Sequence, residues 1–112
     1  MWLFTTTGFF SIVEKEWDRP TQTLTIRARS RDDLDRLRAG LLPELGATVE
    51  DRGADYRYRA QAPRDAVARA MAEAVRQLDY SNFKSAVGKR QGHARAHLYH
   101  DVWEVMYRLQ ES

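Results

Sequence analysis

The chain has 112 residues, which is enough for one hydrophobic core and too few for two. Hydrophobic residues make up 43% and charged residues 30%, proportions of a folded domain that argue against intrinsic disorder. The absence of cysteine excludes a disulfide scaffold, a thiol nucleophile and a cysteine-based zinc site, while a net charge of +2 indicates an anionic partner only weakly.

The chain contains no apolar run close to the ~20 residues that a membrane span needs, so we expect no membrane partner. Its first residues lack both the basic start and the long apolar stretch of a signal peptide. We therefore expect a cytoplasmic protein.

Residues 2–16 are rich in aromatic, β-branched and threonine residues, which predicts a strand with a bulge or bend at Gly8. Residues 17–20 form a predicted turn. In residues 21–29, Leu24, Ile26 and Ala28 alternate with polar side chains, as in a half-buried strand paired with the first.

Ser30 is a candidate N-cap for a helix that carries Leu34, Leu37 and Leu41 and ends between residues 40 and 43. Residues 45–50 are a short strand candidate, and residues 51–53 a turn. The next strand is predicted where Tyr56, Tyr58 and Ala60 alternate with arginines.

Pro63 suits the first turn of a second helix. The apolar stripe predicted for its core-facing side comprises Val67, Met71, Ala74, Val75 and Leu78. After a break at residues 79–82, Ser81 is a candidate cap for a short helix. Residues 88–92 read as a basic connector, and the last helix is predicted from His93 to about Leu109.

The predicted order is ββαββα followed by a C-terminal helical extension. It favours an α+β fold with one antiparallel sheet and helices on one face, and a ferredoxin-like two-layer sandwich fits this order. We expect a single domain over residues 1–112, with the sheet and first helix in residues 1–62 and a helical part in residues 63–112.

Three parts of the chain carry a resemblance: residues 79–84 (DYSNFK), residues 98–103 (LYHDVW), and the opening residues 2–4 (WLF) with 8–11 (GFFS). On these segments the chain resembles a family of small bacterial and phage proteins of roughly this length that have no assigned function. The resemblance covers nearly the whole chain and implies a single domain, but no activity, substrate or catalytic residue.

The longest basic stretch has no acidic residue between Tyr80 and His100, and contains Lys84, Lys89, Arg90 and Arg95. Cations without neighbouring carboxylates suit nucleic-acid or phosphate binding, because phosphate contacts release counterions. A solvated basic loop is the alternative interpretation.

Four arginines on the two alternating strands form a second candidate site: Arg27, Arg29, Arg57 and Arg59. If both strands belong to one sheet, these side chains share its open face, with aromatic residues of the first strand nearby. Some RNA-binding domains stack bases on such a face. An ordinary polar face, or one covered by helices or a second subunit, is the alternative.

His93, His97, His100 and Glu104 fall on one side of the last helix, a spacing that can hold a divalent metal. The pattern is not that of a metalloprotease, because no glutamate follows the first histidine. A polar helix surface, with His97 and Asp101 paired four residues apart, is the alternative.

No catalytic or cofactor motif is present in the sequence, so we expect a non-enzymatic binding or interaction domain without a cofactor. Tyr99, Trp103 and Tyr107 flank the apolar side of the last helix, which suits either core packing or a homodimer contact. Nucleic-acid or phosphate binding through residues 84–95 is the second hypothesis, and a metal protein or small enzyme built on the last helix is the third.

Overall fold

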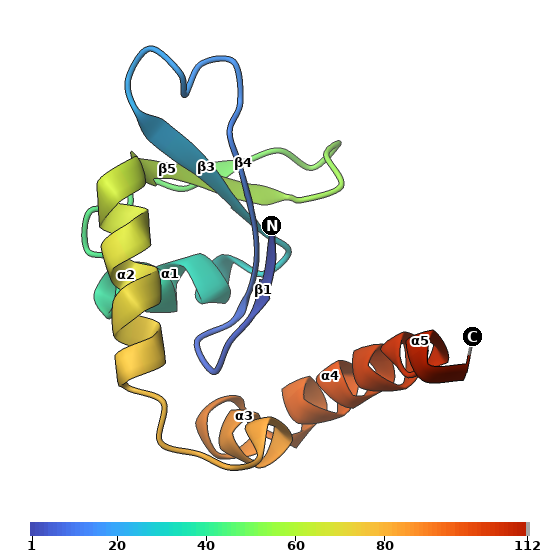
Figure 1. The fold of residues 1–112 in the computed structure, drawn as a ribbon. Helices are drawn as coiled ribbons and strands as arrows, with labels where there is room; N and C mark the ends of the chain where they lie inside the picture. The colour runs from blue at the N-terminus through green and yellow to red at the C-terminus, as the bar shows by residue number, and fades with distance from the viewer. Residues whose placement is uncertain (112) are drawn as a thin grey trace. The chain divides into compact units, whose positions relative to one another are not determined.

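The computed structural model describes residues 1–111 and has an α+β fold with one antiparallel five-stranded sheet, as the sequence predicts (Figure 1). The strands are β1 (Trp2–Phe4), β2 (Phe9–Val13), β3 (Thr23–Ala28), β4 (Val49–Glu50) and β5 (Tyr58–Pro63). Their order in the sheet is β1-β2-β3-β5-β4. The helices are α1 (Arg31–Ala39), α2 (Arg64–Arg76), α3 (Phe83–Gln91), α4 (His93–Met106) and α5 (Arg108–Glu111).

The chain divides into two compact units, Met1–Leu78 and Asp79–Ser112. The sequence predicted a single domain whose helical part begins at residue 63. Within the first unit α2 packs on the sheet, because Ala66, Val67 and Ala70 of this helix belong to the hydrophobic core. Each unit is therefore described separately.

The predicted first strand is two strands, β1 and β2, which pair with each other from Trp2↔Ser11 to Phe4↔Phe9. Residues between them form a turn in which the Thr5 backbone N–H and hydroxyl both donate to the Gly8 carbonyl at 2.9 Å. The expected bend at Gly8 is thus a reversal of the chain. It is stabilised by Thr5, which the sequence pattern assigns to a strand.

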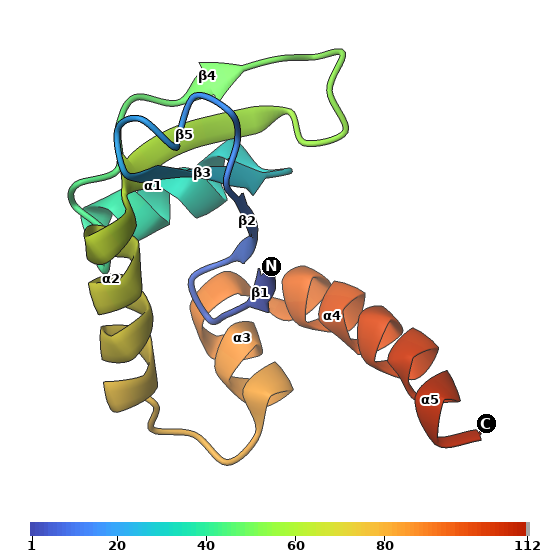
Figure 2. The same ribbon diagram turned by 45° about the horizontal axis from the view of Figure 1, so that its top comes forward.

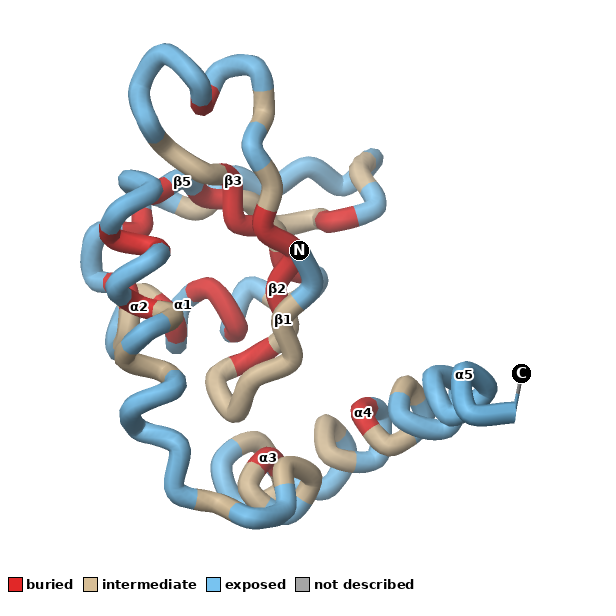
Figure 3. Tube along the Cα trace, viewed as in Figure 1, coloured by how far each residue is buried: buried red, intermediate tan, exposed pale blue. Residues whose placement is uncertain are grey.

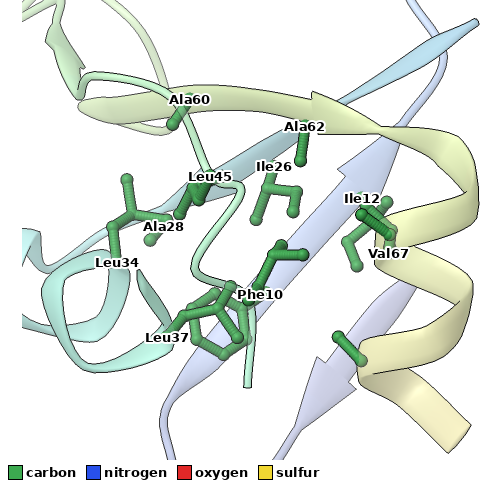
Figure 4. Close-up of a cluster of buried hydrophobic side chains, with 13 residues drawn as sticks. Phe10, Ile12, Ile26, Ala28, Leu34, Leu37, Leu45, Ala60, Ala62 and Val67 are labelled. Carbon is green, nitrogen blue, oxygen red and sulfur yellow. The ribbon is translucent and has the colours of Figure 1, made fainter. Parts of the chain in front are cut away.

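The core of the first unit lies between the sheet and helices α1 and α2 (Figure 4). Alternation along β3 is confirmed, since Ile26 and Ala28 are fully buried and Leu24 packs at the edge of the core. Leu34 and Leu37 of α1 fill the space beneath the strands. Burial of such side chains is the main favourable term in the stability of this unit.

Helix α1 begins after Ser30, as expected, but the Ser30 side chain makes no capping hydrogen bond. The strand expected at residues 45–50 is reduced to the two residues of β4, because Leu45 turns into the core instead. The strand expected from Tyr56 starts at Tyr58, which leaves Tyr56 in the preceding loop.

Helix α2 starts after Pro63, and only the first half of its predicted stripe is buried. Val67 lies in the core and Met71 packs against it, whereas Val75 and Leu78 are 70% and 56% exposed. The small residues Ala66 and Ala70 take the remaining buried positions. The helix therefore contacts the sheet closely at its N-terminal half.

The second unit consists of α3, α4 and the short α5 (Figure 2). The expected capping residue is wrong, because Asn82 caps α3 by accepting a hydrogen bond from the Ser85 backbone N–H at 3.0 Å. The expected connector at residues 88–92 is also wrong, since α3 continues to Gln91. Gly92 ends the helix with φ 92°, a value that favours glycine.

The last predicted helix is α4 followed by α5, with Tyr107 between them. A ferredoxin-like arrangement is not confirmed. None of the helices within residues 1–111 combines the length and the apolar character that a membrane crossing requires.

Candidate functional site

The face of the sheet turned away from α1 and α2, here called the distal face, carries three of the four predicted strand arginines. Alternation along β3 places Arg27 opposite to Ile26 and Ala28. Arg27 pairs with Ser11 on one side and Arg59 on the other, so three neighbouring strands contribute to one row. Arg29 continues the same face just beyond the end of β3.

Tyr56 brings Arg27 and Arg29 together. The guanidinium carbons of Arg27 and Arg29 lie 4.5 and 4.6 Å from the centre of its ring, within cation–π distance. The Phe9 ring lies 6.4 Å from the same ring. The sequence predicts Tyr56 within the alternating strand, whereas it lies in the loop before β5 and is 3% exposed.

The two arginines have no carboxylate partner among the residues that the structure describes. Arg27 donates to the Ser11 hydroxyl at 2.7 Å, and Arg29 donates to the Asp55 carbonyl at 3.3 Å. The Nε of Arg27 is buried without a hydrogen-bond partner. A buried polar atom without a partner costs free energy, so this arrangement of Arg27 is not one that stability alone would select.

Arg59 is partly neutralised on the same face. Its Nη2 lies 3.7 Å from the Asp55 carboxylate, and its Nε donates to the Tyr56 carbonyl at 3.3 Å. The distal face therefore has two uncompensated guanidinium groups, Arg27 and Arg29, beside a third that is paired.

Arg57, the fourth predicted arginine, is paired with a carboxylate. It pairs with Glu50 at 3.0 Å and lies near the Tyr58 ring. Hydrogen bonds from Arg57, then Arg52 and Arg31, lower the pKa of Glu50 to about 2. The Asp51 backbone N–H donates to the Arg57 carbonyl at 2.8 Å, so Arg57 lies beside the end of β4 that carries Glu50.

Aromatic side chains extend the distal face toward the sheet edge at β1. The rings of Phe4 and Phe9 stack with centres 4.5 Å apart, and Trp2 meets Phe9 edge-on at 5.9 Å. Trp2 is 65% exposed, which leaves its indole accessible. The aromatic residues of the first strand approach the strand arginines only indirectly, because the Phe9 ring lies beside the Tyr56 ring that Arg27 and Arg29 contact.

The loop of residues 14–22 borders this face and is held by Asp18, a buried carboxylate that sequence reasoning missed. Asp18 accepts hydrogen bonds from Thr23 at 2.7 Å, from Thr25 at 2.8 Å and from Gln61 at 2.8 Å. Burial by itself would raise the pKa of Asp18, but these bonds and one from the Lys15 backbone N–H lower it below the ordinary value of 3.8. An aspartate within a predicted turn, followed by two alternate threonines, was the available signal.

In the second unit, the four predicted basic residues of the 84–95 segment separate into two pairs. Lys89 and Arg90 line a shallow hollow, and Arg90 lies 3.8 Å from Asp79. The other residues lining the hollow are Asp79, Tyr80, Ser81, Asn82, Ser85 and Ala86. Lys84 and Arg95 lie against other partners, His100 and Tyr99.

Lys84 is directed toward α4, where its Nζ lies 2.9 Å from His100 Nδ1 and 5.0 Å from the centre of the Trp103 ring. Arg95 donates to the Tyr99 hydroxyl at 3.2 Å. These contacts join α3 to α4 and order the start of α4, which is a structural use of two predicted binding residues.

The predicted metal ligands are paired with carboxylates on their own helix. His97 lies 3.9 Å from Asp101, and His100 lies 3.4 Å from Glu104. His93 is exposed at the start of α4. Within residues 1–111, no three or more His, Asp or Glu side chains gather into a group that could hold a metal ion. The His97–Asp101 helix-surface pair is confirmed.

Comparison with known proteins identifies no relative of this chain: no protein-family model, no curated protein and no solved structure matches it. The resemblance to small bacterial and phage proteins therefore stays a prediction.

Proposed function

We propose that the chain is a non-enzymatic binding domain that holds a single-stranded nucleic acid on the distal face of its sheet. The observation that supports this best is the pair of guanidinium groups, Arg27 and Arg29, without a carboxylate partner among the described residues and gathered around Tyr56. A nucleic-acid ligand also agrees with the cytoplasmic location that the sequence predicts.

Phosphate groups would bind to Arg29 first, because its side chain is exposed while Arg27 is half-buried. A guanidinium presents planar donors that match two phosphate oxygens. Each neutralised phosphate releases counterions, so the affinity would fall as the salt concentration rises.

The bases would stack on the aromatic edge of the same face. Trp2 offers an exposed indole, and Phe4 and Phe9 support it from the neighbouring strand positions. Stacking of one base on an aromatic side chain is worth about 1–3 kcal/mol and tolerates any base. A flat sheet face reads unstacked bases, which favours a single strand over a duplex.

The test is a fluorescence-anisotropy titration of a labelled single-stranded oligonucleotide at several salt concentrations. We expect Arg29→Gln to weaken binding and to reduce the slope of log affinity against log salt by about 0.7. Trp2→Ala should weaken binding with the slope unchanged.

Arg76→Gln on α2 is the matched control, since it removes the same charge from an exposed arginine that lies 3.9 Å from Glu73. Equal effects of Arg29→Gln and Arg76→Gln would show general charge attraction in place of a site. Absence of salt-dependent binding to the wild-type protein would exclude the proposal.

A second candidate is a phosphate-bearing ligand in the hollow of the second unit. Lys89 and Arg90 line this hollow together with the hydroxyl groups of Ser81 and Ser85. In the same titration, Lys89→Gln would then reduce binding while Arg29→Gln would leave it unchanged. That outcome would place the binding site in the predicted basic segment of residues 84–95 and exclude the distal face of the sheet.

A further inference from the structure

Helix α4 and the following α5 expose large apolar side chains. Leu98, Val105 and Met106 are 56%, 53% and 54% exposed, and Leu109 of α5 is exposed as well. The tube in Figure 3 is accordingly pale along most of this segment, with one buried position at Tyr99. Apolar side chains that gather on one exposed helix side mark an interaction surface.

Three of these positions, together with the half-buried Val102, repeat with the spacing of a coiled-coil seam. Leu98, Val102, Val105 and Leu109 follow one another at intervals of four, three and four residues. Heptad positions a and d have this spacing, and side chains there pack into a facing helix.

The seam stays continuous across the boundary between α4 and α5. Tyr107 has right-handed helical dihedral angles, and its backbone N–H donates to the Trp103 carbonyl at 3.0 Å. The Gln110 N–H then donates to the Tyr107 carbonyl at 2.9 Å. Figure 2 shows α5 continuing the direction of α4.

Charges beside the seam select its partner and direction. The seam has a flank on each side along the helix. Asp101 and Arg108, seven residues apart, lie on one flank, and Tyr99 and Met106 lie on the other. In an antiparallel pair of identical helices each flank meets its own copy, so Asp101 of one chain meets Arg108 of the other. In a parallel pair the charged flank of each helix would face the uncharged flank of the other helix.

We propose that a second copy of this chain docks on the seam, with the two α4–α5 segments antiparallel about a twofold axis. Because of the twofold axis, the contact between Asp101 of one chain and Arg108 of the other occurs twice in the dimer. The present partner of Asp101 is His97 at 3.9 Å, an exposed pair whose exchange costs little. The seam spans only two heptads, so its area is below that of a standard interface and the dimer is weak and concentration-dependent.

The first experiment is sedimentation equilibrium of the full chain over a wide concentration range. We expect the mass to rise from 13.0 kDa toward twice that value. Val105→Lys should keep the protein monomeric with an unchanged circular dichroism spectrum. His93→Lys, on the same helix but away from the seam, should dimerise as the wild type does.

The second experiment reverses the charges. Asp101→Arg and Arg108→Asp should each weaken dimerisation by roughly tenfold, because each places like charges together at two contacts. The double variant should restore the wild-type constant, and the two single variants mixed together should form a heterodimer. Within one chain these residues lie about 10 Å apart along the helix axis, too far for an internal pair to explain the rescue.

A wild-type protein that stays monomeric at every concentration would overturn the proposal. Dimerisation that survives Val105→Lys, or single variants that the double variant fails to rescue, would overturn the antiparallel seam. The oligonucleotide titration uses other residues, so either result leaves the proposed function to its own test.

Discussion

At the residue scale, Gly8 is a position where no side chain fits. A Cβ atom there would lie 2.5 Å from Cγ and 2.7 Å from Cβ of Asp33 in α1. Rotation of the carboxylate does not relieve the second contact, because Cβ is fixed to the helix backbone. The close approach lets Asp33 accept a hydrogen bond from the Phe9 backbone N–H at 3.0 Å, which joins the first turn to α1.

Gly8→Ala should therefore lower the free energy of unfolding by about 1–3 kcal/mol, the usual cost of overpacking. Urea denaturation followed by circular dichroism measures this loss. Gly53→Ala is the control, since its Cβ would lie at an ordinary 3.5 Å from the Asp51 carboxylate, and a change within about 0.5 kcal/mol is expected. Equal stability of the two variants would mean that β2 and α1 separate easily.

Asp18 connects stability to pH. Hydrogen bonds from Thr23, Gln61 and Thr25 outweigh the effect of burial and lower the folded-state pKa below 3.8. The stabilisation is complete above the unfolded-state pKa and is lost as the pH falls through the lower, folded-state value.

Asp18→Asn should lower the free energy of unfolding by about 1–3 kcal/mol at pH 7, because an amide places donors against donors. The difference from the wild type should begin to shrink as the pH falls below 3.8, where the unfolded-state carboxylate protonates, and should be lost once the pH has passed through the lower folded-state pKa of Asp18. Glu16→Gln, at an exposed position of the same loop, should have little effect. If the difference in the free energy of unfolding did not change with pH, the loss would come from packing and not from the charge of Asp18.

At the element scale, α2 depends on small residues at its contact with the sheet. Ala70 is fully buried beside Val67, whereas Ala68 of the same helix is exposed. The hydrophobic pattern favoured larger side chains further along, and Val75 and Leu78 are instead exposed. Close approach of the helix backbone to the strands selects alanine, which periodicity alone does not reveal.

Ala70→Leu should destabilise the protein by about 1–3 kcal/mol, since the added atoms have no space. Ala68→Leu introduces the same atoms on the solvent side and should change stability by less than about 0.5 kcal/mol. Thermal unfolding of both variants makes the comparison. A tolerated leucine at position 70 would show that α2 can move away from the sheet.

At the scale of the whole molecule, the residues of the main hydrophobic core all precede Asp79. A fragment of residues 1–78 should therefore fold alone and unfold cooperatively. Dispersed amide signals in its NMR spectrum would confirm this, and limited proteolysis of the full chain should cut first near residues 77–82. A fragment without dispersed signals would show that the first unit needs the second for its stability.

Much of the fold was predictable because its signals are local. Alternation in β3 and the leucine spacing of α1 follow from strand and helix periodicity, and both are confirmed. The division of residues 2–16 into two strands was missed, because a threonine-rich turn has the same composition as a strand. The basic connector was assigned wrongly because Gly88 is tolerated within α3.

The candidate site was predicted only in part. Strand periodicity alone was enough to bring Arg27, Arg29 and Arg59 to one face. It could not show that Arg57 binds Glu50, that Asp55 neutralises Arg59, or that Tyr56 lies between the two remaining arginines. These contacts join residues across different strands and loops, and pairing of that kind is not encoded in any single segment.

The sequence by itself determined the fold class, the absence of cysteine chemistry, and the basic and aromatic composition of the strands. Only the tertiary structure decided which arginines stay without a carboxylate and which apolar side chains of α4 remain exposed. The physical reason is that periodicity reports which face of one element a residue occupies, whereas charge compensation and burial depend on what a second element places against that face.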